Sequence, residues 1–491
     1  MNTEDQLIQQ RIDKLNQIRA LGINPYPYSF DQKNHASEIL NKFKKLKKHE
    51  ITKEKVSIAG RIMTIRLMGK ASFLHIQDET GKIQVYLRQD DIGDSSYNLF
   101  KKFDMGDIIG IEGIVFSTKT GEISVWAKKI ELLCKSIRPL PEKWHGLKDT
   151  EERYRKRYLD LISNPEVKEV FIKRAKIINF MREFLNKNGY IEVETPVIQP
   201  IYGGAAAKPF KSYINDLKMD VFLRVSDELY LKRLIVGGFE KVYEISKDFR
   251  NESVDTTHNP EFTMLEFYQA YADYNEMMKI VEDIIVGASK QINRTSKINF
   301  RNHEIEIKKP FEKITMKDAI KKHAKIDIDK LSDKDLKKKL DEHHIKYDEF
   351  SRGNAMQLLF EELVEDKLIQ PTFITDHPIE TTPLCKPTKT NSELIERFEL
   401  FICGFELSNA YSELNDPILQ RKLLEDQAKQ LKKGNEEANP MDEDFLEAIE
   451  TGMPPTGGVG IGIDRLMMVL TGNDSIKDVI LFPFMKSFKN A

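Results

Sequence analysis

The sequence of 491 residues has few cysteines and no long apolar run. Its three cysteines, Cys134, Cys385 and Cys403, lie far apart, which excludes a disulfide framework and a CxxC zinc site. No apolar segment approaches the roughly 20 residues of a membrane-spanning helix. The start, MNTEDQLIQQRIDK, lacks the apolar core of a signal peptide. We therefore expect a cytoplasmic protein without a membrane partner.

An excess of charge of either sign is missing as well, because Lys+Arg 76 and Asp+Glu 78 leave a net charge of −2. The balance of the whole chain therefore does not indicate a nucleic-acid partner, and the local distribution has to be examined. Residues 42–55 are a basic run with seven lysines. This run can follow a phosphate backbone or form a solvated face, and the sequence leaves both interpretations open.

The apolar residues, 40% of the chain, are sufficient to form large buried cores. Together with 31% charged residues, this composition is typical of a soluble globular protein. Apolar residues at helical spacing predict a helix at residues 4–21. A period of two over residues 56–133 predicts five short strands and a small closed barrel of the OB type. We expect this helix and barrel to form a domain over residues 1–140. A linker at 141–165 and a second domain at 166–491, with a helical insertion at about 311–370, would follow.

A barrel of the OB type binds single-stranded nucleic acid by stacking bases on aromatic rings beside cations. Phe73 is the aromatic candidate, and Arg66, Gln84 and Glu122 would complete a base-reading group. The alternative is that Phe73 only fills the barrel core.

Two strand-like stretches, KVYEISKDFRNE and EFTMLEFYQA, flank the polar loop SVDTTHNP. In the second strand, alternation places Phe262, Glu266 and Tyr268 on one side. An ionised Glu266 among apolar neighbours would be costly unless a cation neutralised it. Arg250 and Glu252 also share a side of the first strand. The pattern indicates a ligand site, although an ordinary ion pair on a sheet face would produce the same spacing.

A second polar group lies in ERFELFICGFELSNAYSELND. A hairpin around Cys403 would place Glu399 and Glu406 opposite each other or one step from opposite, where they could hold Mg²⁺ together with substrate phosphates. Beyond the turn, strand alternation places three more polar side chains on one face: Asn409, Tyr411 and Glu413. An ion pair or a solvated edge is the alternative for each individual acid.

The segment MPPTGGVGIGIDRLMMVL is rich in glycine. A strand with so little side-chain bulk lets a flat ligand and its phosphates approach the backbone. Arg465 would enter with the first turn of the following helix, and Asp464 would face any pyrophosphate there. The spacing matches neither GxGxxG nor GxxxxGK[ST], which disfavours a Rossmann or P-loop nucleotide site.

Taken in order, these stretches resemble the three signature motifs of the class II aminoacyl-tRNA synthetases and, within that family, the lysyl-tRNA synthetases. The helix and strand that end at Pro196 resemble motif 1, FRNE with its loop and EF resembles motif 2, and GVGIGIDR resembles motif 3. GGAAAKPF, RVSDELYLKRLIVGGFEKVYEI and NAYSELND extend the similarity over nearly the whole chain. The resemblance implies an α+β fold: an N-terminal OB-fold barrel that grips the anticodon, then a catalytic domain on an antiparallel sheet of six to seven strands.

The resemblance also implies a reaction, in which ATP activates L-lysine to lysyl-adenylate and the lysyl group moves to the 3′-terminal adenosine of tRNA(Lys). It implies Mg²⁺ as the cofactor and a homodimer formed through motif 1. The base-reading group of the barrel would then be the anticodon site.

Roles carry over by position from the family motifs. Arg250 and Arg465 would be the catalytic residues and would bind the α- and γ-phosphates of ATP, with Phe262 stacked on the adenine and Glu252 and His258 orienting the nucleotide. Gly204 and Glu228 would receive the α-ammonium of lysine, and Asn409 would help to fix its carboxylate. Glu266, Tyr268 and Glu413 would take the ε-ammonium, with Tyr411 along the methylenes. Glu399 and Glu406 would hold Mg²⁺.

Three alternatives remain from the sequence. Aspartyl- and asparaginyl-tRNA synthetases share the motifs, but their substrates have no terminal cation to match Glu266 and Glu413. An enzyme that attaches lysine to elongation factor P would lack the barrel. A catalytically silent RNA-binding regulator would not need Arg250 and Arg465. Specificity for lysine requires Glu266 and Glu413 to face one cavity, with neither of them neutralised by an arginine.

Overall fold

The computed structural model describes residues 3–141, 147, 149–347 and 350–486. The chain forms two compact units, Met1–Gly146 and Leu147–Ala491. The expected linker and insertion fall partly outside the described residues, at 142–146, 148 and 348–349, as does the end of the expected second domain at 487–491. Within the described residues, no helix has both the length and the apolar character needed to cross a membrane.

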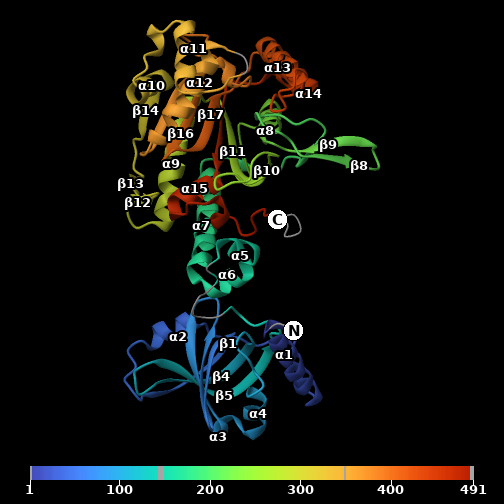
Figure 1. Ribbon diagram of the computed structural model, residues 1–491, viewed down its shortest axis with the longest axis vertical. Helices are drawn as coiled ribbons and strands as arrows, with labels where there is room; N and C mark the ends of the chain where they lie inside the picture. Colours follow the sequence, from blue (N-terminus) through green and yellow to red (C-terminus); the bar gives the residue numbers. More distant parts are fainter. Residues whose placement is uncertain (1–2, 142–146, 148, 348–349, 487–491) are drawn as a thin grey trace. The chain divides into compact units, whose positions relative to one another are not determined.

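The N-terminal unit is a five-stranded closed barrel of order β1-β2-β3-β5-β4, as predicted (Figure 1). The strands are β1 (Ile51–Met68), β2 (Ala71–Gln77), β3 (Lys82–Arg88), β4 (Ile108–Ser117) and β5 (Ile123–Cys134). Its helices are α1 (Thr3–Ala20), α2 (Ala36–Phe43), α3 (Gln89–Ile92) and α4 (Asp94–Phe100). Alternate residues such as Leu74 and Val85 fill the barrel core, which Ile18 of the predicted N-terminal helix also joins.

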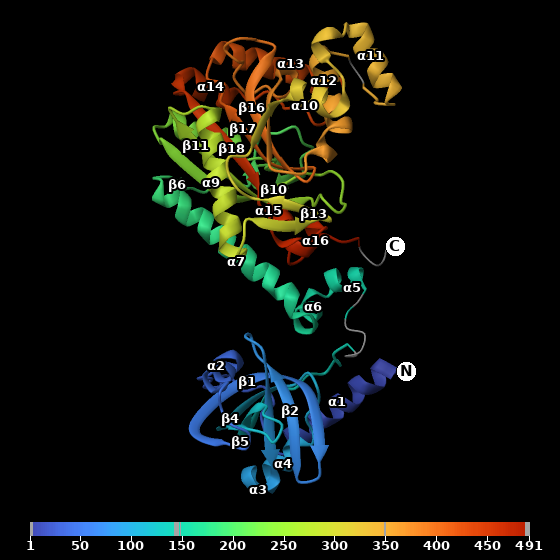
Figure 2. The same ribbon diagram turned by 90° about the vertical axis from the view of Figure 1, so that its left-hand side faces the viewer.

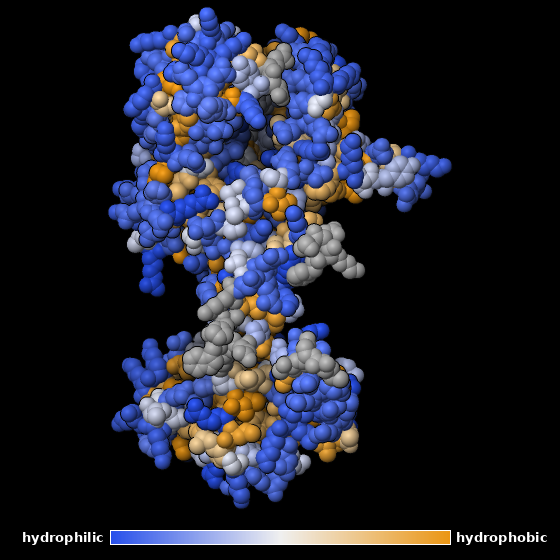
Figure 3. Space-filling view, viewed as in Figure 1, coloured by the Kyte–Doolittle hydropathy of each residue, from blue (hydrophilic) through white to orange (hydrophobic). Residues whose placement is uncertain are grey.

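The surface of this unit carries both charged and hydrophobic residues. All seven lysines of the run 42–55 are exposed to solvent, as expected for a solvated face. On the largely hydrophilic face drawn in Figure 3, a group of hydrophobic residues interrupts the surface of the N-terminal unit.

The second unit is built on an eight-stranded sheet of order β14-β15-β16-β17-β18-β11-β10-β6. The strands are β6 (Ile191–Glu192), β10 (Lys241–Phe249), β11 (Glu261–Ala270), β14 (Glu312–Thr315), β15 (Thr372–Pro378), β16 (Leu394–Ile402), β17 (Phe405–Ser412) and β18 (Thr456–Gly462). The six central strands are antiparallel, whereas β14 and β6 pair in parallel at the two edges. The expected number of six to seven strands was therefore too low, because the insertion begins with the edge strand β14.

One face of this sheet is covered by the helices α7 (Pro165–Lys187), α9 (Tyr274–Ile292) and α15 (Ile463–Thr471) (Figure 2). Pro165 starts α7 at the position predicted from Asn164-Pro165, where its missing N–H costs nothing. Leu265 and Phe267 of β11 point into this core, so alternation turns Glu266 and Tyr268 toward the opposite face. That opposite face carries the candidate site.

The other elements surround the sheet. Near the opposite face are α8 (Glu228–Val236), α13 (Pro417–Lys432), α14 (Glu443–Gly452) and a small sheet of β7 (Ile198–Gln199), β8 (Lys211–Ile214) and β9 (Met219–Leu223). The predicted helical insertion contains α10 (Met316–Ala324), α11 (Asp333–Glu342) and α12 (Arg352–Leu363). The remainder are α5 (Thr150–Arg155), α6 (Arg157–Ser163), α16 (Ile476–Val479) and the hairpin of β12 (Lys297–Phe300) and β13 (His303–Glu306).

Candidate active site

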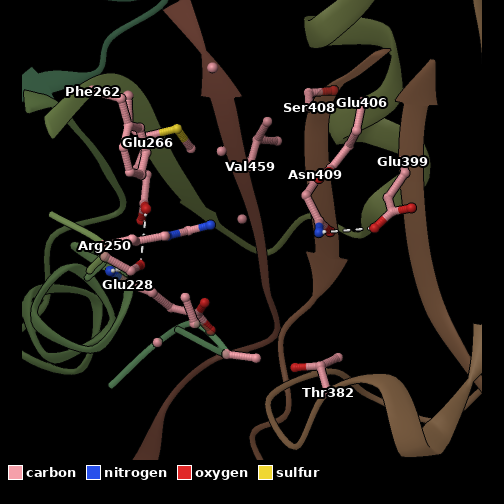
Figure 4. Close-up of a pocket in the computed structure, with 18 of the residues that line it drawn as sticks. Glu228, Arg250, Phe262, Glu266, Thr382, Glu399, Glu406, Ser408, Asn409 and Val459 are labelled. Carbon is pink, nitrogen blue, oxygen red and sulfur yellow. Dashed lines mark hydrogen bonds between the residues drawn. The ribbon is translucent and has the colours of Figure 1, made fainter. Parts of the chain in front are cut away.

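A cavity of about 480 Å³ lies over the open face of the sheet in the second unit. All residues that the sequence assigned to ATP, lysine and Mg²⁺ line this cavity. Figure 4 places Glu266 and Arg250 on one side of the glycine-rich strand β18, and Asn409, Glu399 and Glu406 on the other. The structure therefore brings together segments that are more than 250 residues apart in the chain, from Gly204 to Arg465.

The sheet register explains this arrangement. Glu266 of β11 lies opposite Gly460 of β18, and Gly460 lies opposite Asn409 of β17. One row further along, Gly458 lies between Tyr268 and Tyr411. The candidate side chains thus approach each other over Gly458 and Gly460 of the central strand, which have no side chains.

The glycine at position 458 has a more specific role than the sequence indicated. A Cβ there would lie 2.1 Å from Glu413 Oε1 and 2.4 Å from Tyr268 Cε1. Side chains of this protein, rather than a ligand alone, therefore occupy the space above Gly458. The open backbone at this point allows Tyr268 and Glu413 to meet.

The expected lysine pocket is acidic and buried. Its three carboxylates belong to Glu228, Glu266 and Glu413, whose exposures are only 5%, 5% and 1%. The Glu266 carboxylate accepts hydrogen bonds from Ser226 Oγ at 3.0 Å and from Tyr268 Oη at 3.3 Å. Burial, together with the nearby Asp227, Asp248 and Glu228 carboxylates, raises the pKa of Glu266 well above its usual value. A bound ammonium would relieve this repulsion.

A lysine that the sequence reasoning missed pairs with two of these acids. Lys232 Nζ donates to Glu228 Oε1 at 2.6 Å and forms an ion pair with Glu413. Among the described residues, neither Glu266 nor Glu413 pairs with an arginine, although the buried ammonium of Lys232 is a cationic partner of Glu413. The sequence did contain a signal for this ion pair, because Glu228 and Lys232 are four residues apart, the spacing at which side chains on a helix meet.

Two arginines line the part of the cavity that we expect to hold the phosphates. The Arg250 guanidinium lies 5.1 Å from the centre of the Phe262 ring. Arg465 follows β18 in the first turn of α15, as predicted, and donates to the Glu406 carbonyl oxygen at 3.0 Å. Its Nη2 also lies 3.2 Å from His258 Nε2. Cations and an aromatic ring therefore share one surface, as a nucleotide with phosphates requires.

Glu252 and Asp464 differ in their surroundings. Glu252 is exposed at the rim and accepts a hydrogen bond from the Lys208 backbone N–H at 3.3 Å. Asp464, whose place at the start of the helix counted against a Rossmann-type pyrophosphate site, lines the cavity. Its carboxylate pairs with Arg174 at 2.6 Å and accepts from the Thr263 backbone N–H at 2.7 Å, so it belongs to the packing of α7 against the sheet.

The Glu399 and Glu406 pair also departs from the sequence prediction. Glu406 lies opposite Phe401, because the two-residue turn at Cys403 and Gly404 pairs Ile402 with Phe405, and Glu399 lies opposite Asn409 beyond a register shift. The two acids are therefore neither opposite nor one step from opposite, although both line the cavity.

Arg397, which the sequence reasoning also missed, pairs with Glu399 Oε1, and the Asn409 side chain donates to the same oxygen at 3.3 Å. Among the described residues, the other oxygen of Glu399 has no hydrogen bond. Two carboxylates on a cavity wall fit Mg²⁺, which takes one or two carboxylates and completes its shell with substrate phosphates.

A further acidic cluster lies behind Glu266. Single carboxylate oxygens of Asp227, Asp248 and Glu266 lie within 4.8 Å of one another. Arg224 compensates part of this charge by pairing with Asp227 at 2.9 Å and with Glu244 at 2.7 Å. Burial and the neighbouring acids raise the pKa of Asp227 to about 8, although Arg224 opposes the shift. The cluster adds negative potential at the end of the expected lysine pocket.

The barrel unit carries a separate candidate site. Phe73 is partly buried, and its ring lies 4.7 Å from that of Tyr86. Gln84 donates to Glu122 at 2.8 Å, and His75 contacts the same carboxylate at 3.1 Å. Arg66 lies opposite Phe73 on β1. The predicted group therefore lies close together on β1, β2, β3 and the turn before β5. Phe73 packs outside the core cluster of the barrel rather than filling it.

Tyr86 and His75 were missed, although they share a side with the predicted residues and alternation could have identified them. Tyr86 extends the aromatic surface to Phe116 and Trp126, whose ring centres lie 5.8 Å and 6.0 Å from its own.

Comparison with known proteins agrees with these observations. Residues 149–486 match the family model described as tRNA synthetases class II (D, K and N), and residues 56–133 match the OB-fold nucleic acid binding domain. The lysine–tRNA ligase of Carboxydothermus hydrogenoformans is 51% identical over 484 residues, covering 98% of each chain. The lysine–tRNA ligase of Methanoculleus marisnigri is 50% identical, covering 97% of this chain and 94% of the relative. With such similarity along almost its full length, the chain belongs to the lysine–tRNA ligase family of class II tRNA synthetases.

Proposed function

We propose that this protein activates L-lysine with ATP and transfers the lysyl group to the 3′-terminal adenosine of tRNA(Lys). The observation that carries the proposal is the buried acidic pocket beside two arginines. Glu228, Glu266 and Glu413 carry three negative charges and Lys232 carries one positive charge, so the pocket has a formal charge of −2. The two ammonium groups of lysine match this charge, whereas a neutral or acidic side chain would leave buried carboxylates unpaired.

The proposed binding mode follows the cavity from end to end. Glu228 and Gly204 receive the α-ammonium, and Glu266, Tyr268 and Glu413 receive the ε-ammonium. A methyl group at Gly204 would lie 3.0 Å from Glu228 Cβ, so the chain passes close to this acid. Tyr411 supplies the wall along the methylenes, and Asn409 helps to hold the carboxylate near Arg250.

In the first step, the lysine carboxylate attacks the α-phosphorus of ATP and pyrophosphate leaves. This displacement needs alignment and positive charge rather than a protein nucleophile. Arg250 supports the α-phosphate and Arg465 the γ-phosphate, while Phe262 stacks on the adenine and His258 and Glu252 orient the nucleotide. In the second step, the 3′-hydroxyl of the tRNA attacks the carbonyl carbon of the adenylate and releases AMP.

We assign Glu399 and Glu406 as the protein ligands of Mg²⁺. Both acids line the cavity together with Arg250 and Arg465, and Arg465 Nη1 lies 3.7 Å from Glu406 Oε2. Burial and the neighbouring Glu399 raise the pKa of Glu406, although Arg465 and Arg397 oppose the shift. A divalent cation would hold both acids ionised and would neutralise charge on the phosphate oxygens.

We further propose that the barrel binds the anticodon through Phe73, Arg66, Gln84 and Glu122, and that two copies of the chain associate through motif 1. Apolar side chains in the motif 1 segment and directly after Pro196 support the second point. Ile191, Val197 and Ile198 are 51%, 40% and 53% exposed in the single chain, and a partner copy would cover them. Light scattering of the purified protein distinguishes the dimer from the monomer.

Exchange of labelled pyrophosphate into ATP tests the central proposal. We expect lysine to support exchange, and aspartate, asparagine and arginine to remain near the level without amino acid. Exchange with none of the amino acids would indicate a protein that has lost catalysis. Exchange with aspartate or asparagine alone would overturn the assignment of the acidic pocket.

A further inference from the structure

Lys232 lies behind the wall of the lysine pocket rather than in it. Its side chain is fully buried on α8, and it does not line the cavity. Both of its partners, Glu228 and Glu413, do line the cavity. A bound amino acid would therefore touch the two acids but not the ammonium that links them.

The two linked acids come from different parts of the fold. Glu228 is the first residue of α8, and Glu413 follows the end of β17. In the proposed function, Glu228 serves the α-ammonium end of the substrate and Glu413 the ε-ammonium end. A cation that bonds both acids therefore fixes the separation between the two ends of the pocket.

The surrounding contacts leave Lys232 well placed for this role. Burial disfavours its charge, but the carboxylates of Glu228 and Glu413 outweigh that effect and raise the pKa of the ammonium. Gly458 leaves room for both Glu413 and Tyr268, since a Cβ there would lie 2.1 Å from Glu413 Oε1 and 2.4 Å from Tyr268 Cε1. Glu413 thus has Lys232 as its cationic partner and packs closely over Gly458.

We propose that Lys232 is a positioning residue that sets the length of the diamino acid accepted by the pocket, and so favours lysine over its shorter homologue ornithine. The inference rests on the proposed function. Lys232 acts through Glu228 and Glu413 and contacts no reacting atom. Without it, the two acids would repel each other, one would take up a proton, and their separation would no longer be fixed.

The test compares pyrophosphate exchange with lysine and with ornithine in the full-length wild type and in Lys232→Met. Enzymes distinguish two substrates that differ by one methylene by about 10–200-fold in kcat/KM. We expect the KM for lysine to rise about tenfold and the lysine-over-ornithine ratio of kcat/KM to fall about tenfold, amounts typical of one lost ion pair or methylene contact. The KM for ATP should stay within about twofold, since no phosphate contact changes.

Arg233→Met provides the matched control. Arg233 is the next residue on the same helix and pairs with Asp442 at 2.9 Å, away from the cavity. Its loss removes a cation and an ion pair from α8 without changing the pocket. If the lysine-over-ornithine ratio of kcat/KM fell equally in both variants, Lys232 would only contribute to the stability of α8, and the inference would be wrong.

Two further variants decide the question even if Lys232→Met does not fold. Lys232→Arg keeps the cation but replaces it with a longer, planar group, so lysine should still bind while the preference over ornithine falls. In the Lys232→Met/Glu413→Gln double variant, the effects on the KM for lysine should be far from additive if Lys232 acts through Glu413. The inference is wrong if Lys232→Arg keeps the wild-type lysine-over-ornithine ratio of kcat/KM. It is also wrong if the two substitutions have additive effects on the KM for lysine in the double variant. Absence of lysine-dependent exchange in the wild type would instead overturn the proposed function.

Discussion

Gly458 lies directly opposite Tyr268 in the sheet, and a methyl group on Gly458 would come within 2.4 Å of the tyrosine ring. Because real Cβ atoms do not approach so closely, Gly458→Ala must displace Tyr268 or Glu413. We expect the KM for lysine to rise by about tenfold or more, since each displaced polar contact is worth about 1 kcal/mol or more. Steady-state exchange kinetics with varied lysine and varied ATP measure the effect.

Gly462→Ala is the matched control on the same strand. A methyl group there would lie 3.8 Å from its nearest neighbour, the Leu407 carbonyl oxygen, which is an ordinary contact. This variant should retain the lysine KM of the wild type. Equal kinetics in the two alanine variants would contradict the packing argument for Gly458.

Glu266 and Glu413 make separable contributions to lysine binding. Glu266→Gln removes the acid that has only hydroxyl partners, whereas Glu413→Gln leaves Lys232 with Glu228. A hydrogen bond to a charged group contributes about 1.5–3 kcal/mol, so each change should raise the KM for lysine about 10–100-fold. The KM for ATP should change far less. An unchanged lysine KM in either variant would remove that acid from the pocket.

Arg250 and Arg465 should affect the rate more than binding. Each guanidinium would stabilise charge that develops on the phosphates in the transition state, so Arg250→Ala and Arg465→Ala should each lower kcat about 10²–10³-fold. Single-turnover measurement of adenylate formation isolates this step. If kcat at saturating ATP and lysine remained near the wild-type value, the residues would contribute only to ground-state binding.

The sequence predicted much of the site because strand alternation is local. The side shared by Phe262, Glu266 and Tyr268 follows from a period of two, and the structure has the same parity. Arg465 could be placed because a strand of glycines ends where a helical pattern begins. The five-stranded barrel was also predictable from the period of two and the turn residues, although β1 with 18 residues and β5 with 12 are longer than the short strands expected.

The parts that were missed depend on tertiary contacts or on register. No local pattern states that α8 packs beside the end of β17, so the pairing of Lys232 with Glu413 was not visible. The same is true of Asp227 and Asp248, which lie 21 residues apart and meet only in the fold. Glu399 and Glu406 were misplaced because the two-residue turn at Cys403 and Gly404 pairs Ile402 with Phe405, which puts Phe401 rather than Glu399 opposite Glu406.

Asp227 should make the stability of the protein depend on pH. Its pKa is about 8 in the folded protein, against about 4 for an ordinary aspartate. Between these values the folded state keeps a proton that the unfolded state has lost. The free energy of unfolding should therefore fall as pH rises through this window, by at most about 1.4 kcal/mol per pH unit from this group.

Asp227→Asn removes that proton equilibrium while keeping the shape of the side chain. We expect the variant to gain stability over the wild type as the pH is raised from 5 to 9, measured by urea unfolding. Asp444, which is largely exposed, offers the control variant Asp444→Asn. Parallel curves of unfolding free energy against pH for the wild type and Asp227→Asn would contradict the assignment of a raised pKa.

Phe73 should affect the tRNA-dependent step alone. Base stacking on an aromatic ring is worth about 1–3 kcal/mol, so Phe73→Ala should lower kcat/KM for tRNA(Lys) about 5–150-fold. Exchange of pyrophosphate without tRNA should remain unchanged, because Phe73 belongs to the barrel unit. Tyr28→Ala removes a fully exposed aromatic ring from the same unit and should leave both activities intact. Equal aminoacylation by Phe73→Ala and the wild type would mean that the aromatic surface around Tyr86 does not read the anticodon through Phe73.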